Sequence, residues 1–244
     1  MKQYFILALL LTGAIATDAQ VKQGTIIYER KTDVHRHMQD EQMKAMVPQF
    51  QTSKNELIFN ETISVFKPVT EDEAPDPFNN GSGAIVNIRI GGPGDNGVLY
   101  KNFASQKLLE QTEVEDKKYI IDDTIRTLQW KLADETKNIL NHVCKKATAK
   151  TERGNDVIAY YAEDIASPVG PENFGGLPGA VLLVDVNNGD MVYTATEIKS
   201  DTDKKELKEP TEGKHLSRAD FQNKMDKIFG KPGSDGSRRI IRRN

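Results

Sequence analysis

Residues 180–196, "AVLLVDVNNGDMVYTAT", decide the fold of this chain. The first seven residues are almost wholly apolar, which predicts a strand that is covered on both faces. Asn188 and Gly189 are the strongest short hairpin signal, because a type I′ turn needs positive φ at both central residues. We therefore expect a hairpin with these pairs: Asn187 with Asp190, Val186 with Met191, Val184 with Tyr193, and Leu182 with Ala195.

The glycine-proline segment before this hairpin, "GGLPG" at 175–179, predicts a chain reversal. Proline at the second position and glycine at the third are typical of a type II turn, here Leu177–Ala180. Gly175 and Gly176 allow further unusual backbone angles or a close approach to a neighbouring element. A phosphate-binding loop is not expected, since a strand follows and the glycines do not precede Lys and Ser or Thr.

The loop "GPENF", residues 170–174, is not required by that turn. It carries polar Glu172 and Asn173, and we expect Phe174 to be exposed. If this region binds a ligand, we expect the contacts at these three residues.

The rest of the chain predicts a mainly β (α+β) protein, because consecutive strands with short connections build an antiparallel sheet. We expect a large curved meander or half barrel, with a C-terminal helix and a short N-terminal helix packed on it. The expected strands begin with "GTIIYERKT" at 24–32, "NELIFNETISVFKPV" at 55–69, reversed at "FNE", and "AIVNIRI" and "VLYKNF", with the loop 91–97 between them. Further strands are expected at 108–114, 119–122 and 127–132. Two more are expected on either side of a turn at Gly154 and Asn155, the first of them in "NILNHVCKKATAK" at 138–150.

Two amphipathic helices are predicted. In "HRHMQDEQMKAMVPQF", residues 35–50, Met38, Met43 and Met46 fall near helical spacing. In the C-terminal helix, Ser217 is the expected N-cap and Gly230 the expected C-cap.

The organisation expected is a signal peptide at 1–19, one β-rich domain at 20–230 and a flexible basic tail at 231–244. The apolar run "FILALLLTGAIA" is too short to cross a bilayer and precedes a small-residue cleavage site at Ala19. A periplasmic or secreted location follows, with no transmembrane segment in the mature chain.

Composition limits the function. The formal net charge is −3, with 37% hydrophobic and 28% charged residues. The sequence therefore lacks the excess of positive charge that is typical of nucleic-acid-binding proteins. The single cysteine, Cys144, cannot form an internal disulfide and is expected as a small buried apolar residue on a strand. The acidic loop 70–77 lacks the ligand pattern of a calcium-binding EF-hand. We expect the basic residues 238–243 to form a frayed terminus, with contact to anionic lipid or another protein as the alternative.

"GPENFGGLPGAVLLVDVNNG" resembles the signature of the GLPGLI family, exported proteins of Bacteroidota-type bacteria with no established activity. The upstream block "WKLADETKNILNHVCKKATA" and "AYYAEDI" are similar too. The residues that match the signature are Gly170, Pro171, Phe174, Gly176, Leu177, Pro178 and Gly179, with Ala180 and Val181 in place of Leu and Ile. The resemblance implies an accessory role in the envelope, near TonB-dependent outer-membrane systems.

Three functions compete on this sequence. The first is a non-catalytic periplasmic protein that binds an apolar ligand, in a cavity lined by Leu183, Tyr193 and Phe229, or a protein partner. The second is copper or other metal binding through His35, His37 and Met38, which are soft or borderline ligands. The third is an uncharacterised hydrolase, for which His142 near Cys144 is the only hint. No cofactor and no recognisable catalytic set are predicted.

Overall fold

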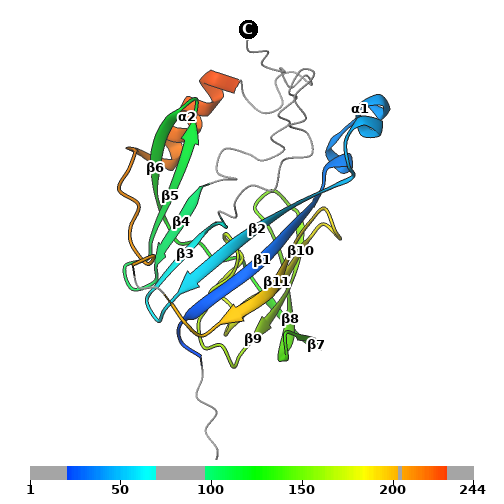
Figure 1. The fold of residues 1–244 in the computed structure, drawn as a ribbon, viewed down its shortest axis with the longest axis vertical. Coiled ribbons are helices and arrows are strands. Elements are labelled where there is room, and N and C mark those ends of the chain that lie inside the picture. The colour runs from blue at the N-terminus through cyan, green and yellow to red at the C-terminus, as the bar shows by residue number, and fades with distance from the viewer. Residues whose placement is uncertain (1–20, 70–96, 203–204, 230–244) are drawn as a thin grey trace, which may run out of the picture.

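The protein consists mainly of one large curved β-sheet with a helix near its C-terminus (Figure 1). The structure, a computed structural model, describes residues 21–69, 97–202 and 205–229. The N-terminal half contains β1 (Gly24–Asp33), the 3₁₀ helix η1 (Val34–His37), α1 (Glu41–Met46), β2 (Phe50–Phe59), β3 (Ile63–Pro68), β4 (Val98–Asn102), β5 (Lys107–Val114) and β6 (Lys117–Thr124). The second half contains β7 (Lys131–Ile139), β8 (His142–Lys150), β9 (Asp156–Ala162), β10 (Ala180–Val186), β11 (Met191–Lys199), β12 (Lys214–Ser217) and α2 (Arg218–Phe229).

Two meanders join side by side to make the sheet, whose strand order is β12-β6-β5-β4-β3-β2-β1-β11-β10-β9-β8-β7. Strands β1 to β6 run outward in one direction, and β7 to β11 return from the opposite edge until β11 pairs with β1. These pairings are antiparallel, as predicted. The exception is β12, which pairs with β6 in parallel at the other edge and was not expected.

Tight turns set the register of two of the hairpins. Glu115 and Asp116 connect β5 to β6, and Leu140 and Asn141 connect β7 to β8, all four with positive φ between 48° and 67°. Two consecutive left-handed residues are what a type I′ turn requires, and they suit the right-handed twist of the strands. Leucine at such a position is unusual, which is why sequence patterning did not locate the second turn.

The hairpin β10–β11 is confirmed, with a different tip. Val186 pairs with Met191 and Val184 with Tyr193, whereas the predicted pairs Asn187–Asp190 and Leu182–Ala195 do not occur in the β10–β11 register. Asn187, Asn188 and Gly189 all have positive φ, and the Asp190 amide donates to the Val186 carbonyl at 3.0 Å. The loop therefore has four residues, and the two-residue turn was wrong.

Two other strand predictions were wrong in their limits. Residues 125–130 form no strand, and β7 starts only at Lys131. Residues 138–150 are not one strand, because the turn at Leu140 and Asn141 separates β7 from β8. The alternating pattern continues through that turn, so periodicity alone could not reveal it.

The predicted N-terminal helix is shorter than expected and does not pack on the sheet. It divides into η1 and α1, and α1 projects beyond the ends of β1 and β2 (Figure 1). None of its residues is buried, and the Met46 side chain is 78% exposed. The side chain of Asp40 caps α1 by accepting from the Gln42 amide at 2.8 Å. The helical spacing of the methionines therefore did not indicate a core-facing helix.

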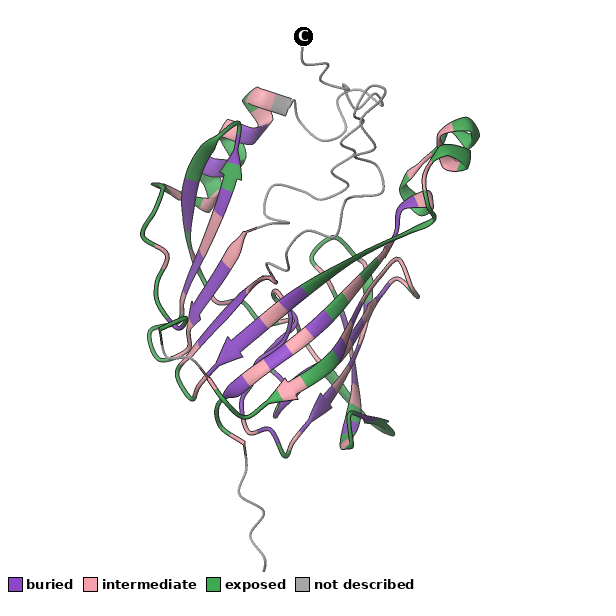
Figure 2. Ribbon diagram, in the orientation of Figure 1, coloured by how far each residue is buried: buried purple, intermediate pink, exposed green. Residues whose placement is uncertain are grey.

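Buried residues alternate with more exposed ones along the strands (Figure 2), and they form clusters on both faces of the sheet. The inner face is the one that carries the largest cluster, which includes Ile26, Tyr28, Leu57, Phe66, Leu99, Leu108, Cys144, Ala159, Val184 and Tyr193. The outer face of β2 to β6 carries a second cluster, Ile58, Val65, Tyr100, Leu109, Ile120 and Leu207. The two clusters follow from the period-2 alternation of strand side chains.

Helix α2 packs against β6, as predicted for a C-terminal helix. Phe221 and Met225 are buried against Tyr119, Ile121 and Val114. The N-cap is confirmed, because Ser217 Oγ accepts from the Asp220 amide at 3.1 Å. Arg218 binds Glu110 at 2.7 Å and Asp123 at 3.0 Å, which ties the start of the helix to β5 and β6.

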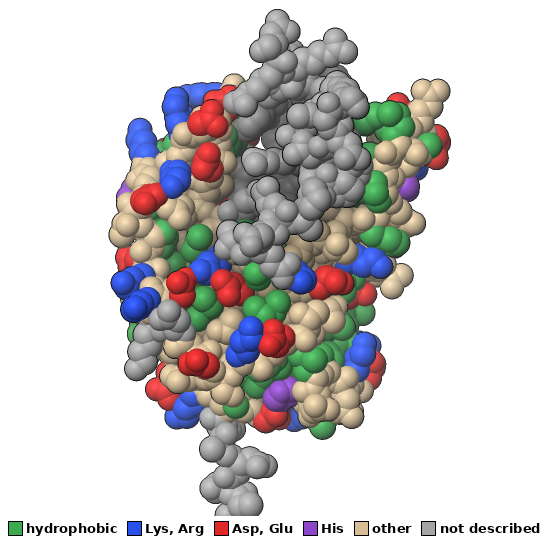
Figure 3. Space-filling model, in the orientation of Figure 1, with side chains coloured by type: hydrophobic (Ala, Val, Ile, Leu, Met, Phe, Trp, Pro, Cys, Tyr) green, Lys and Arg blue, Asp and Glu red, His purple; other side chains and the backbone are tan. Residues whose placement is uncertain are grey.

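Several sequence predictions lie outside the described residues. These are the signal peptide 1–19, the acidic loop 70–77, the strand "AIVNIRI" with the loop 91–97 (apart from Gly97), Gly230, the Phe229 side chain and the tail 231–244. In the part of the chain that is described, no helix has the length and apolar character needed to span a membrane. Figure 3 shows acidic and basic side chains interspersed over the visible surface.

Candidate functional site

The segment that attracted attention in the sequence, residues 163–179, connects β9 to β10 and lies within the inner-face core. We call it the signature segment. Its apolar side chains Ile165, Val169, Phe174 and Leu177 are buried in the same cluster as Tyr28 and Tyr193. Its backbone folds on itself, since the Gly176 amide donates to the Pro168 carbonyl at 2.8 Å. The segment is thus part of the core and not a loop on the surface.

The glycines of this segment act differently from the prediction. A type II turn would require positive φ at Gly179, but the left-handed glycine is Gly176, with φ of +87°. At Gly179 a β-carbon would lie 2.1 Å from the carbonyl oxygen of Ala162. The residue must therefore be glycine, because the backbone at Gly179 touches the backbone at Ala162. The predicted type II turn was wrong.

A polar cluster surrounds Glu172. Its carboxylate accepts a hydrogen bond from the Tyr193 hydroxyl, with 2.5 Å between the oxygens, and its backbone carbonyl accepts from the Lys101 ammonium. Glu172 itself has φ of 46°, a left-handed conformation that is uncommon for a residue with a side chain. Strands β4 and β11, which lie far apart in the sheet, are thereby joined through one residue of the signature segment.

The lysine of this cluster is in an unusual environment. Lys101 is only 7% exposed, and burial lowers its pKa to about 8 while the nearby charge of Glu172 opposes the shift. A buried ammonium is costly because it loses its hydration, and groups with strongly shifted pKa values gather at functional sites.

Aromatic rings and one arginine complete the cluster. Tyr193 contacts Phe66 and Phe174, with ring centroids 6.2 and 6.3 Å apart, and Arg30 lies 5.9 Å from the Tyr193 centroid. The Tyr28 hydroxyl donates to the carbonyl of Val181 at 2.6 Å. The cluster combines a cation, a carboxylate and hydroxyl groups with aromatic rings, but its lysine, tyrosines and phenylalanines are all less than 10% exposed. Among the predicted contact residues, half-buried Glu172 and exposed Asn173 remain accessible to a ligand.

The predicted contact residues have three different environments. Asn173 is exposed and Glu172 is half-buried, whereas Phe174 is 9% exposed and was wrongly expected at the surface. Lys101 was not predicted as a member of the site, and Tyr193 was predicted only as part of an apolar cavity lining. The signal for Lys101 was slight, a lysine within the otherwise apolar "VLYKN" of β4, because only the fold brings it to the signature segment.

The residues predicted to line an apolar cavity are only partly described, because the Phe229 side chain lies outside the described residues. Leu183 pairs with Thr194 and Val184 with Tyr193, so Leu183 and Tyr193 lie on opposite faces of the hairpin. Tyr193 is fully buried and Leu183 is half-buried against the same apolar cluster, so both side chains take part in core packing.

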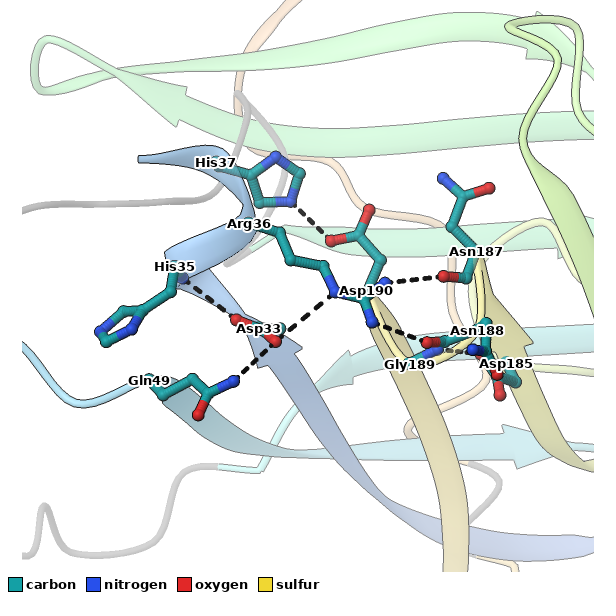
Figure 4. Close-up of polar contacts among 10 residues, drawn as sticks. All are labelled: Asp33, His35, Arg36, His37, Gln49, Asp185, Asn187, Asn188, Gly189 and Asp190. Carbon is teal, nitrogen blue, oxygen red and sulfur yellow. Dashed lines mark hydrogen bonds and ion pairs between the residues drawn. The ribbon is translucent and has the colours of Figure 1, made fainter. Parts of the chain in front are cut away.

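Two of the three predicted metal residues, His35 and His37, lie in a hydrogen-bonded network beside the tip of β10–β11 (Figure 4), and Met38 follows them as the C-cap of η1. His37 Nε2 contacts Asp190 at 2.7 Å, whereas His35 Nε2 contacts the carbonyl of Val47 at 2.9 Å. Arg36, between them, donates to the carbonyls of Asn187 and Asn188 at 2.8 and 2.9 Å. The two imidazoles therefore have separate partners.

This network fixes the start of the projecting η1–α1 region to the hairpin. Asp33 receives hydrogen bonds from Gln49 and from the His35 amide, at 3.0 and 3.2 Å. Burial acts to raise the pKa of Asp33, but these bonds and Arg36 outweigh it, so the pKa is lowered. Among residues 21–69, 97–202 and 205–229 no group of three or more His, Cys, Asp or Glu side chains could hold a metal ion. The arrangement gives the copper hypothesis no support.

Cys144 is buried on β8, as predicted. Burial, together with the charge of Asp164, raises its pKa to about 11, so the thiol is protonated at neutral pH. His142 contacts Asp164 at 2.6 Å, and the thiol lies 3.5 Å from the backbone carbonyl of His142. A thiolate nucleophile would need the opposite pKa shift. The pair gives no support to a hydrolase.

Known proteins share this fold. The family model described as the N-terminal domain of N-glycanase, of the PNGase F-II type, matches residues 94–223, which is 130 of 244 residues. Two solved structures of PNGF-II, in space groups C2 and P21, align with a TM-score of 0.57 and 16% identity. They cover 85% of this chain, which spans only about a third of their length, 33% and 34%. No curated protein matches significantly. Because the family model covers more than half of the sequence, the chain belongs to the family of the PNGase F-II N-terminal domain.

Proposed function

We propose that this protein is an exported, non-catalytic accessory domain that binds its ligand on the inner face of the sheet, beside Glu172. Family membership carries the proposal, because the family is defined by an N-terminal domain and the chain spans about a third of PNGF-II. The apolar run at 1–19 supports export into the envelope, and the resemblance to the GLPGLI signature supports an accessory role there.

The ligand class to test first is an N-glycosylated peptide. The family takes its name from an N-glycanase. The accessible part of this region offers groups that suit a hydroxyl-rich ligand, namely the half-buried Glu172 carboxylate and the exposed Asn173 amide. The buried Lys101 and Tyr193 hold Glu172 in place. An envelope protein or an apolar ligand, expected from the sequence, is the alternative occupant of the same face.

Isothermal titration with a peptide that carries a high-mannose N-glycan tests this function, with the same unglycosylated peptide as control. We expect saturable binding of the glycopeptide alone, weakened at least tenfold by Glu172→Gln and also weakened by Asn173→Ala, an exposed change that leaves the core intact. Glu113→Gln, on the outer face, is the matched control and should bind like the wild type. Absence of binding would refute the glycan as ligand, and release of the glycan, seen by mass spectrometry, would refute the non-catalytic role.

A further inference from the structure

A short segment of the chain covers part of the outer face of the sheet. Residues 205–213, which we call the strap, precede β12 and run along the β4–β6 side of the molecule, drawn in orange in Figure 1. Leu207 is 8% exposed and sits in the outer-face cluster with Ile58, Val65, Tyr100, Leu109 and Ile120. Other strap residues that flank it are exposed.

The strap carries a glutamate at every third position, and each binds a lysine of a different strand. Glu206 pairs with Lys67 on β3, Glu209 with Lys107 on β5 at 2.8 Å, and Glu212 with Lys118 on β6 at 2.5 Å. Each of these three lysines of the outer face, which we call the lysine row, thus meets one glutamate of the strap.

One backbone contact accompanies these pairs. Gln111 of β5 donates through Nε2 to the carbonyl of Glu212 at 2.6 Å. The hydrogen bonds with Glu209 and Glu212 raise the pKa values of Lys107 and Lys118, respectively. The two lysines therefore stay charged over the whole physiological range and attract acidic groups.

The contacts that hold the strap are weak individually. The side chains of the three ion pairs are between 25% and 71% exposed, and such surface pairs contribute little and are screened by salt. Leu207 is the single apolar anchor. A separate peptide with a leucine beside the first of three regularly spaced glutamates can form all of these contacts.

We propose that the outer face of β3–β6 is a docking surface for extended acidic peptide segments, and that the strap occupies it as an internal competitor. The partner is a segment with acidic residues at every third position and one apolar anchor. The lysine row pairs with the acidic residues of the peptide, and the outer-face cluster packs against its apolar residue. Its ligand and its face differ from those of the proposed glycopeptide site, so the two proposals stand or fall separately.

A fluorescently labelled synthetic peptide of residues 205–213, KELKEPTEG, tests the docking surface by anisotropy. The full chain with Leu207→Ser has a loosened strap, and we expect it to bind this peptide at least tenfold more tightly than the wild type does. Binding should weaken strongly between 50 and 500 mM salt, because the ion pairs are exposed. A peptide with all three glutamates replaced by glutamine should not bind.

A second loosened chain guards against misfolding of the first. The full chain with Glu206→Gln, Glu209→Gln and Glu212→Gln changes only exposed residues, and it should also take up the peptide. Adding Lys107→Met to the Leu207→Ser chain should weaken peptide binding. If neither loosened chain binds the peptide, if all chains bind it equally, or if the glutamine peptide binds as well, the proposal is wrong.

Discussion

Two connecting segments cover the two faces of this sheet, and they are held in opposite ways. The signature segment, residues 163–179, lies in the inner core and is fixed by backbone contacts so close that Gly179 has no room for a β-carbon. The strap, residues 205–213, lies on the outer face and is held by one leucine and exposed ion pairs. Close packing tolerates little change, whereas solvated ion pairs can open and close, so the signature segment is held rigidly and the strap can exchange.

The largest expected effect is in the signature segment. Gly179→Ala places a β-carbon 2.1 Å from the Ala162 carbonyl oxygen, so two backbones must separate. We expect a loss of about 3 kcal/mol in the free energy of unfolding, measured by urea denaturation.

Gly154→Ala is the matched control for that change. Gly154 is also in a turn, with φ of +84°, but nothing lies within 4 Å of its added β-carbon. Its cost should be only about 1 kcal/mol, from the left-handed backbone alone. Equal effects of the two substitutions would contradict the close approach at Gly179.

The second effect concerns the buried lysine beside the signature segment. Because the pKa of Lys101 is lowered to about 8, the folded protein loses this proton at a lower pH than the unfolded chain, whose lysine titrates near 10.5. Between these pH values the unfolded state binds more protons, so the contribution of Lys101 makes stability rise with pH. The gain from pH 7 to pH 9.5 should be about 2 kcal/mol.

Lys101→Met isolates this contribution, because the groups that titrate elsewhere are the same in both proteins. The unfolding free energy of the wild type minus that of Lys101→Met, measured by urea denaturation at each pH, should rise by that amount from pH 7 to pH 9.5. A difference that stays constant with pH would show that Lys101 titrates normally and is not buried as a cation.

The smallest effect is expected in the strap. Glu209→Gln removes one exposed ion pair with Lys107 and should change the free energy of unfolding by less than about 0.5 kcal/mol. Hydrogen exchange of the amides of β12, the edge strand that directly follows the strap, should nevertheless become faster, because local opening costs less than global unfolding. A large global loss would mean that the strap is part of the core.

Much of the architecture was readable from local patterns. The mainly β class, the hairpin β10–β11, the strand that buries Cys144 and the Ser217 N-cap depend on side-chain alternation and on backbone angles, which a few neighbouring residues determine. The errors lie where local signals are ambiguous. The methionine spacing at 38–46 fits a helix but says nothing of what the helix packs against, and Leu140 hides a turn inside an alternating run.

The candidate site was only partly predictable. Glu172 and Asn173 were found because their loop is not needed by the turn, but Lys101 lies 71 residues away in sequence and meets Glu172 only through the sheet order. The same is true of the strap, since Glu209 and Lys107 are 102 residues apart.

The sequence by itself determined the β class, the hairpin β10–β11 and the N-cap of the C-terminal helix. Tertiary structure alone decided why Gly179 must be glycine, where Lys101 is buried and which lysines receive the strap. The physical reason is that backbone preference and side-chain alternation act over a few residues. Burial, pKa shifts and ion pairs instead depend on groups that only the folded chain brings together.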